Sequence, residues 1–238
     1  MSSAIRLITF DLDDTLWDVR PALEAAEAAQ WCYLNARFPS LALAATPQEQ
    51  MANLRRQLIE EQPELMHHIS LFRQTFIERL LQYHDVSASE AELAAREAFA
   101  AFLSQRHQVV LYANVESMLN TLGRQFQLGT LTNGNADVRK TEIGSYFDYA
   151  WRAEEFGISK PDPALFHKAF EEAGVSADQV IHVGDCHDND VSGAVSAGAQ
   201  AIWFSPEGSV SAIASEVVQG LSELPAAIKR LTGQQGLS

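Results

Sequence analysis

Short apolar runs, each ended by a polar turn, recur along the chain and predict the strands of a sheet. The first run, Ile5–Phe10, is apolar and partly β-branched, as in a strand buried on both faces. Further runs predict strands at Gln127–Thr132, Tyr149–Ala153, Val180–Val183 and Ala201–Phe204. Because helical segments separate these runs, we expect the strands to pair in parallel, as a Rossmann-like doubly wound α/β sheet.

The segments around the later strands carry helical patterns. An N-cap aspartate and an N1 proline, Asp162 and Pro163, begin one helix that runs to Gly174. The other helices expected in this part of the chain span Val115–Arg124, Asp137–Ser145 and Asp190–Ala197, with helical material after Phe204 to about Leu231. The last residues, GQQGLS, are expected to fray.

A long block with a different texture separates the first strand from the others. From about Val19 to Gln108, alanine, leucine, glutamate, glutamine and arginine dominate, and no strong strand signal interrupts them. Capping boxes at Thr46 and Ser87, and breaks at two prolines, divide the block into helices near 19–36, 47–61, 64–84 and 88–106. We therefore expect an α/β core made of residues 1–17 and 109–238, with an inserted all-helical domain of residues 18–108.

Composition narrows the class of protein. With 47% hydrophobic and 20% charged residues, the chain of 238 residues falls in the range of soluble globular proteins. The 31 acidic and 17 basic residues give a net charge of −14, which argues against nucleic acid or an anionic membrane as a partner. No apolar run approaches the roughly 20 residues of a membrane span, and no signal peptide is evident. Two distant cysteines, Cys32 and Cys186, indicate reduced thiols, and we expect a cytoplasmic protein.

Polar clusters follow the predicted strands, at the edge where open α/β sheets bind ligands. Asp11, Asp13 and Asp14 come directly after the first strand, and their mutual repulsion would be relieved by a divalent cation such as Mg²⁺. Thr132 and Asn133, followed by a glycine, can present N–H groups to an oxyanion. The alternatives are an Asp-rich turn at the first cluster and an ordinary asparagine turn at the second.

Two more clusters lie later in the chain. Lys160, held between turn residues, can place a positive charge beside a phosphate, although most such lysines are simply on the surface. Asp185 and Asp190 bracket the loop after the Val180–Val183 strand, and Asp190 can also be read as the N-cap of the next helix. His182 and His187 flank Asp185, but a carboxylate-rich site suits a hard cation better than zinc.

Taken in order, these clusters resemble the motifs of the haloacid dehalogenase-like (HAD) superfamily. The matching stretches are FDLDDTL at Phe10–Leu16, LTNG at Leu131–Gly134, SKPDP at Ser159–Pro163 and VGDCHDND at Val183–Asp190. The resemblance covers nearly the whole chain, and the helical block between the first and second motifs resembles the family's helical C1 cap.

The resemblance implies a role for each matching residue. Asp11 matches the nucleophile that forms an aspartyl-phosphate, and Asp13 matches the general acid/base. Thr132, with the backbone of Asn133, and Lys160 match the groups that bind the phosphoryl oxygens and neutralise their charge.

The same resemblance implies a Mg²⁺ site. Its ligands would be the Asp11 carboxylate, the backbone carbonyl of Asp13 and the Asp185 carboxylate, with Asp190 in support. Asp190 ranks below Asp185 here, because its helix-capping role could account for it.

The implied activity is that of a Mg²⁺-dependent phosphatase acting on a small-molecule phosphomonoester, as a monomer or homodimer. An aspartate at position 13 favours phosphoryl transfer over 2-haloacid dehalogenation, because a halide leaves without a proton. A phosphomutase and a non-catalytic HAD-fold binding protein also fit these motifs. A looser resemblance, which includes Trp17, points to bacterial phosphatases of flavin mononucleotide and of a riboflavin-pathway pyrimidine phosphate. Trp17 could stack on a planar ring or pack between the core and the cap, and a redox role for Cys186 stays open.

Overall fold

The computed structural model describes residues 4–233. Fraying is expected for the last six residues, GQQGLS, and all of these except Gly233 lie outside the described range. The chain divides into two compact units. One is formed by Met1–Val19 together with Val109–Ser238, and we call it the sheet unit. The other, Arg20–Gln108, is the helical unit.

The sheet unit is built on six parallel strands in the order β3-β2-β1-β4-β5-β6. Their bounds are β1 Leu7–Phe10, β2 Gln127–Thr132, β3 Tyr149–Arg152, β4 Val180–Gly184, β5 Gln200–Phe204 and β6 Glu216–Val218. β1 is buried along its whole length, as its apolar sequence predicts. The parallel α/β sheet is therefore confirmed.

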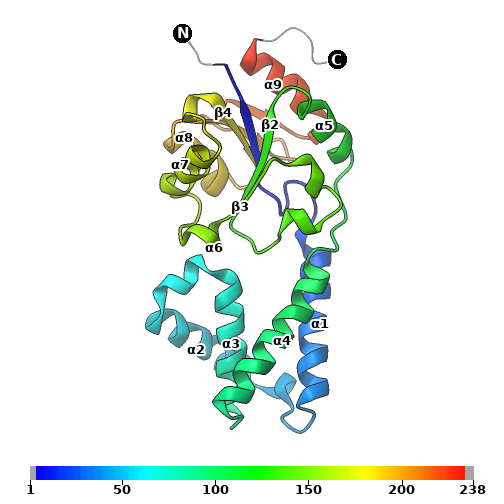
Figure 1. Cartoon of the computed structure of the whole chain (residues 1–238), viewed down its shortest axis with the longest axis vertical. Helices are drawn as coiled ribbons and strands as arrows, with labels where there is room; N and C mark the ends of the chain where they lie inside the picture. The colour runs from blue at the N-terminus through cyan, green and yellow to red at the C-terminus, as the bar shows by residue number, and fades with distance from the viewer. Residues whose placement is uncertain (1–3, 234–238) are drawn as a thin grey trace. The chain divides into compact units, whose positions relative to one another are not determined.

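Helices cover both faces of this sheet (Figure 1). Ile8 and Phe10 of β1 share a core with α5 (Val115–Leu122) and α9 (Leu224–Thr232). Leu7 belongs to a second core with α7 (Pro163–Glu172) and α8 (Gly193–Ser196). The short helix α6 (Ala153–Phe156) follows β3. The neighbours of β1 are β2 and β4, with Phe10 level with Thr130 and Val183, so the turns after these three strands come together at one edge.

Three expectations about local structure are wrong. Asp137–Ser145 forms two 3₁₀ turns, η3 (Val138–Lys140) and η4 (Gly144–Tyr146), in place of a helix. The segment from Asp190 begins inside a π-helical turn, η6 (His187–Ser192), and only then becomes α8. After Phe204 the chain forms β6 and the turn η7 (Leu221–Glu223) before α9, because three residues are too short a strand to leave a periodic signal.

The helical unit contains the expected helices and, within its described residues, no strand. They are α1 (Val19–Arg37), α2 (Gln48–Glu61), α3 (Ile69–Tyr83) and α4 (Ala88–Arg106), with the 3₁₀ turns η1 (Leu43–Ala45) and η2 (Pro63–His67). The segment expected as one helix from 64 to 84 is thus divided between η2 and α3. No described helix in the whole protein is both long and apolar enough to cross a membrane.

The helix-capping predictions had mixed results. The Asp162 side chain caps α7 by accepting from the Ala164 N–H at 2.9 Å, as expected. The Ser87 side chain makes no capping bond to α4. Thr46 does not cap α2 either, since its hydroxyl lies 2.9 Å from His84 Nε2.

Candidate active site

The residues singled out in the four sequence motifs line one cavity of about 220 Å³ in the sheet unit. The predicted site residues that line it are Asp11, Asp13, Thr132, Asn133, Lys160, Asp185 and Asp190. Gly134, Cys186 and Asn189 complete the lining. The cavity lies where the turns after β1, β2 and β4 meet, which is the ligand-binding edge of an open parallel sheet.

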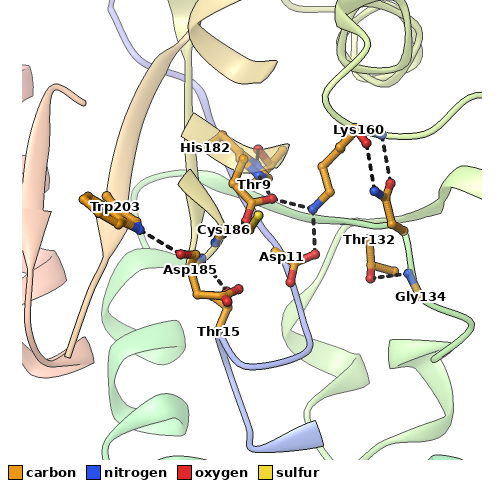
Figure 2. Close-up of polar contacts among 12 residues, drawn as sticks. Thr9, Asp11, Thr15, Thr132, Gly134, Lys160, His182, Asp185, Cys186 and Trp203 are labelled. Atoms are coloured by element: carbon orange, nitrogen blue, oxygen red, sulfur yellow. Dashed lines mark hydrogen bonds and ion pairs between the residues drawn. The ribbon is translucent and has the colours of Figure 1, made fainter. Parts of the chain in front are cut away.

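Lys160 lies between two carboxylates at the bottom of this site. Its Nζ is 2.6 Å from Asp11 Oδ1 and 2.6 Å from Asp190 Oδ1, and Figure 2 shows it reaching toward Asp11. The side chain is only 4% exposed, so the reading of Lys160 as a surface lysine is wrong. Burial alone would lower its pKa, but the two carboxylates outweigh burial and raise the pKa of Lys160 well above its ordinary value. Lys160 is therefore a permanent cation here.

Asp190 is a buried partner of this lysine and not a helix cap. Its Oδ1 contacts Lys160, and its Oδ2 accepts from the backbone N–H of Cys186 at 2.9 Å. Burial would raise its pKa, but Lys160 and then His182 lower the pKa of Asp190 well below the ordinary range. The alternative reading of Asp190 as the N-cap of a helix is therefore wrong.

Three carboxylates form a cluster that fits a hard cation. Asp11, Asp185 and Asp190 each place one oxygen within 4.8 Å of the other two. Burial raises the pKa of Asp11 well above its ordinary value, and the neighbouring Asp190 and Asp13 add to this against the opposing effect of Lys160. Burial, followed by Asp190, also raises the pKa of Asp185. Negative charge at Asp11 and Asp185 is thus incompletely compensated, and an oxygen-preferring divalent cation would supply the balance.

The second and third motifs are joined by hydrogen bonds. The Asn133 Oδ1 accepts from the Lys160 backbone N–H at 2.8 Å, and its Nδ2 donates to the Lys160 carbonyl at 2.9 Å. The Thr132 hydroxyl accepts from the Gly134 N–H at 3.0 Å (Figure 2). The Asn133 side chain therefore fixes the backbone that carries the lysine, a role beyond the one expected from sequence.

Comparison with known proteins gives a decisive match. The model of the haloacid dehalogenase-like hydrolase family matches residues 5–198. The chain belongs to this family. It is 34% identical over 203 residues to the Escherichia coli 5-amino-6-(5-phospho-D-ribitylamino)uracil phosphatase YigB, covering 85% of this chain and 84% of that protein. A phosphoserine phosphatase of Thermus thermophilus is 34% identical over 134 residues, which is 54% of each chain.

Solved structures agree with this assignment. A 2-haloacid dehalogenase from Pseudomonas syringae is 40% identical, with a TM-score of 0.91, and the match covers 95% of this chain and 99% of that one. The HAD-hydrolase YfnB from Bacillus subtilis, at 20% identity, shares the fold with a TM-score of 0.63 over 98% of this chain and all of that one. The several curated phosphatases among the relatives identify this HAD-like hydrolase as a phosphoric monoester hydrolase.

Sequence reasoning missed the residues that position the motif side chains of this HAD-like hydrolase. The Thr15 hydroxyl donates to Asp185 Oδ1 at 2.9 Å and accepts from the Asp185 N–H at 3.0 Å. The Trp203 indole donates to the Asp185 carbonyl at 2.7 Å, and both contacts appear in Figure 2. Thr15 belongs to the first motif, and this position was the one sequence signal for its role. Nothing in the sequence around Trp203 indicated a contact with the site.

Two residues for which the sequence suggests other roles also position motif side chains. Trp17 is completely buried in the core of the sheet unit, so it cannot stack on a ligand, and its Nε1 donates to Asp13 Oδ1 at 2.9 Å. His182 lies between Thr9 Oγ1, at 2.8 Å, and Asp190 Oδ1, at 3.3 Å. Burial lowers the pKa of His182, so its ring is neutral and orients the carboxylate that holds Lys160.

Proposed function

We propose that this protein is a Mg²⁺-dependent phosphatase that hydrolyses a small phosphomonoester through an aspartyl-phosphate on Asp11. The observation that carries the proposal is the shared cavity, in which Asp11, Asp13 and the buried Lys160 lie together. A nucleophilic carboxylate, a second carboxylate able to carry a proton and a fixed cation are the groups that phosphoryl transfer requires.

The proposed reaction has two steps. A carboxylate oxygen of Asp11 attacks phosphorus, the bond to the ester oxygen breaks, and Asp13 gives its proton to the departing alcohol. Asp13 then takes a proton from a water molecule, whose oxygen displaces Asp11 from phosphorus and releases inorganic phosphate. Lys160 and the Thr132 hydroxyl stabilise the phosphoryl oxygens in both steps, with the backbone of Asn133 in support.

The carboxylate cluster would hold the metal ion. Asp11 and Asp185 would provide side-chain ligands and Asp13 its backbone carbonyl, with Asp190 supporting the site through its neighbours. The bound ion would supply positive charge between the phosphate dianion and the Asp11 carboxylate, which otherwise repel each other. The raised pKa values of Asp11 and Asp185 support this assignment.

We further propose that the substrate is flavin mononucleotide or a phosphorylated pyrimidine of riboflavin synthesis. The similarity to YigB, whose name states a phosphorylated ribitylaminouracil as its substrate, supports this class. The similarity to a 2-haloacid dehalogenase supports a second candidate, dehalogenation. Asp13 favours the phosphatase, because halide departure needs no proton donor.

The test is to separate the two steps with Asp13→Asn. This variant keeps the backbone carbonyl and loses the proton carrier, so turnover of an alkyl phosphate should fall by about 10²–10⁴-fold. With 4-nitrophenyl phosphate, whose phenol leaves without a proton, we expect a rapid burst of nitrophenol followed by slow turnover. Rapid mixing with Mg²⁺ present measures both phases.

Asp14→Asn is the matched control. Asp14 is exposed, its backbone has φ 59°, and its Oδ1 accepts from the Val19 N–H. Asparagine tolerates this left-handed conformation and can accept the same bond, so activity should be retained. Equal losses for aryl and alkyl substrates, with no burst, would refute the role of Asp13. Release of chloride from 2-chloropropionate without phosphatase activity would favour the dehalogenase.

A further inference from the structure

A pair of buried polar side chains interrupts the apolar layer between the sheet and helices α7 and α8. Leu7 of β1 and Val180 of β4 belong to that layer. The next residues on the same face of the two strands are Thr9 and His182. They are level with each other in the parallel pairing of β1 with β4, and both are completely buried. Figure 2 shows the two side chains together, at positions where the core pattern favours apolar residues.

The fold gains little from the hydrogen bond within this pair. Thr9 Oγ1 lies 2.8 Å from His182 Nδ1. The net stability from a buried hydrogen bond is small, because each group gives up a bond to water, and replacing both partners by apolar groups of the same shape can be nearly neutral. Valine and phenylalanine would fill the two positions with little change in shape. The pair therefore points to a role in positioning another group.

The other ring nitrogen of His182 faces the candidate active site. Its Nε2 lies 3.3 Å from Asp190 Oδ1, and the same oxygen lies 2.6 Å from Lys160 Nζ. Lys160 Nζ in turn lies 2.6 Å from Asp11 Oδ1. A continuous line of buried hydrogen bonds thus runs from Thr9, through the His182 ring, to the carboxylate proposed as the nucleophile.

Aromatic packing holds the plane of the His182 ring. Phe166 of α7 makes an edge contact with it, with ring centroids 5.2 Å apart and planes at 87°. Phe166 is completely buried, and a Cβ atom added at Gly193 would meet its Cε2 at 2.7 Å. Because packing restricts the plane of the ring, the hydrogen bonds at its two nitrogens set its place within that plane.

The contacts of the ring indicate which of its nitrogens carries a proton. Both oxygens of Asp190 accept hydrogen bonds, Oδ1 from the Lys160 ammonium and Oδ2 from the Cys186 N–H at 2.9 Å. Asp190 is therefore a carboxylate that can only accept, and Nε2 of His182 must donate to it. Burial lowers the pKa of His182 and keeps the ring neutral, so Nδ1 accepts and the Thr9 hydroxyl donates.

We propose that Thr9 is a positioning residue: its hydroxyl anchors Nδ1 of His182, so that the proton on Nε2 points at Asp190. Without the hydroxyl, Nδ1 would be a buried acceptor with no donor, and the ring would shift to relieve this. The shift would weaken the hold on Asp190 and displace Lys160. Only the effect on turnover rests on the proposed phosphatase function.

¹⁵N NMR of the histidine rings tests the anchor without any substrate. The His182 signals are those missing from the spectrum of His182→Gln. Wild type should show a neutral ring with its proton on Nε2, protected from solvent exchange. In Thr9→Val, which loses the hydroxyl at nearly constant shape, the Nδ1 signal should move downfield as it does when a nitrogen loses a hydrogen-bond donor. Thr9→Ser keeps the hydroxyl and should restore the wild-type signal.

Turnover tests the consequence for the active site. In Thr9→Val, kcat for 4-nitrophenyl phosphate should fall by about 10-fold, as is common when a group that orients a metal or catalytic residue is removed. Thr9→Ser should retain most of the activity. Thr130→Val is the matched control, because Thr130 is a buried threonine on β2 whose hydroxyl has no hydrogen bond to the site within the described residues. It should keep the wild-type kcat.

A double variant separates this role from stability. Thr9→Val alone leaves Nδ1 unpaired in the core and should melt a few degrees below wild type. Thr9→Val combined with His182→Phe removes both partners, so its melting temperature should return toward that of wild type while kcat stays about 10-fold low. A pair that served stability alone would instead regain kcat together with the melting temperature.

Three results would each overturn the proposal. They are a wild-type His182 ring with its proton on Nδ1 or on both nitrogens, an unchanged Nδ1 signal in Thr9→Val, and wild-type kcat in a variant that lacks the Thr9 hydroxyl. A wild-type protein that hydrolyses no phosphomonoester would refute the phosphatase alone. The NMR signals would then still decide whether Thr9 anchors the ring.

Discussion

Lys160 supplies one positive charge to a cavity whose described lining carries four carboxylates, those of Asp11, Asp13, Asp185 and Asp190. The formal balance of −3 is unfavourable for a bound phosphate dianion. Burial, and to a smaller extent repulsion from Asp190 and Asp13, raises the pKa of Asp11, the proposed nucleophile. The charge of Asp11 should therefore affect the free energy of unfolding.

Asp11→Asn should stabilise the metal-free protein at pH 7. The folded-state pKa of Asp11 lies above its ordinary value of 3.8, so the folded state is penalised increasingly as pH rises from 3.8 to that raised pKa, and fully above it. The penalty vanishes well below pH 3.8, where the carboxyl is protonated in both states. In chelator at pH 7 the variant should melt a few degrees higher, since about 1 kcal/mol shifts Tm by roughly 2–4 °C at this size.

Differential scanning fluorimetry at several pH values checks this. The difference in Tm between variant and wild type should shrink as pH falls toward 4, and Mg²⁺ should stabilise wild type more than the variant. A lower Tm for Asp11→Asn at pH 7 would show that the ion pair of Asp11 with Lys160 outweighs both its burial and the repulsion from neighbouring carboxylates.

The site residues that the sequence predicts are those that stand close together in short motifs. Asp11, Asp13, Lys160 and Asp185 stand in short motifs that the sequence displays directly. The contacts of Trp17 with Asp13 and of His182 with Asp190 were not predicted. Hydrogen-bond direction depends on rotamers and on the packing of distant segments, which motif spacing does not encode.

At the scale of elements, the end of β4 determines where Asp190 lies. The π-helical turn η6 turns back toward β4, and a Cβ atom on Gly184 would overlap the Asp190 carboxyl group. Glycine at position 184 therefore lets the strand approach the carboxylate that holds Lys160.

Gly184→Ala should displace Asp190 and, with it, Lys160. Because a shift of about 1 Å at a catalytic group can cost about 10²-fold in rate, kcat on 4-nitrophenyl phosphate should fall by that order. Gly220→Ala serves as the control, since an added Cβ there meets its first neighbour only at 3.5 Å. Steady-state assays of both variants decide the point, and near wild-type kcat for Gly184→Ala would contradict this role of the glycine.

The elements that sequence patterns missed share one physical property. η6 and β6 are short, and each is stabilised by tertiary contacts more than by its own periodicity: a buried carboxylate in η6 and a single neighbouring strand for β6. The longer strands and the helices of the helical unit have clear periodicity and lie close to their predicted positions.

At the scale of the whole molecule, the net charge is unevenly divided. The sheet unit holds 20 acidic and nine basic residues, a net charge of −11, whereas the helical unit holds 11 acidic and eight basic residues, a net charge of −3. The cavity proposed to bind phosphate therefore lies in the more acidic unit, whose field attracts divalent cations and repels anions.

Added salt should consequently lower KM for a dianionic substrate. The Debye length falls from about 30 Å at 0.01 M to about 10 Å at 0.1 M, which screens the repulsion while leaving buried contacts intact. At saturating Mg²⁺ we expect KM to fall by about two- to fivefold over this range, with kcat unchanged. Phosphocholine, whose cation offsets its phosphate charge, should show little change. A KM that rises with sodium chloride would contradict the repulsive field.

The reciprocal hydrogen bonds between Thr15 and Asp185 join positions 170 residues apart, with the helical unit in between. During synthesis, the first motif leaves the ribosome long before its partner exists. At about 5–20 residues per second, this interval is on the order of ten to thirty seconds. A nascent or truncated chain that ends before β4 holds Asp11, the proposed nucleophile, but lacks Asp185 and Asp190. If Asp185 and Asp190 are required as proposed, the chain gains activity only late in translation, and incomplete chains leave the substrate intact.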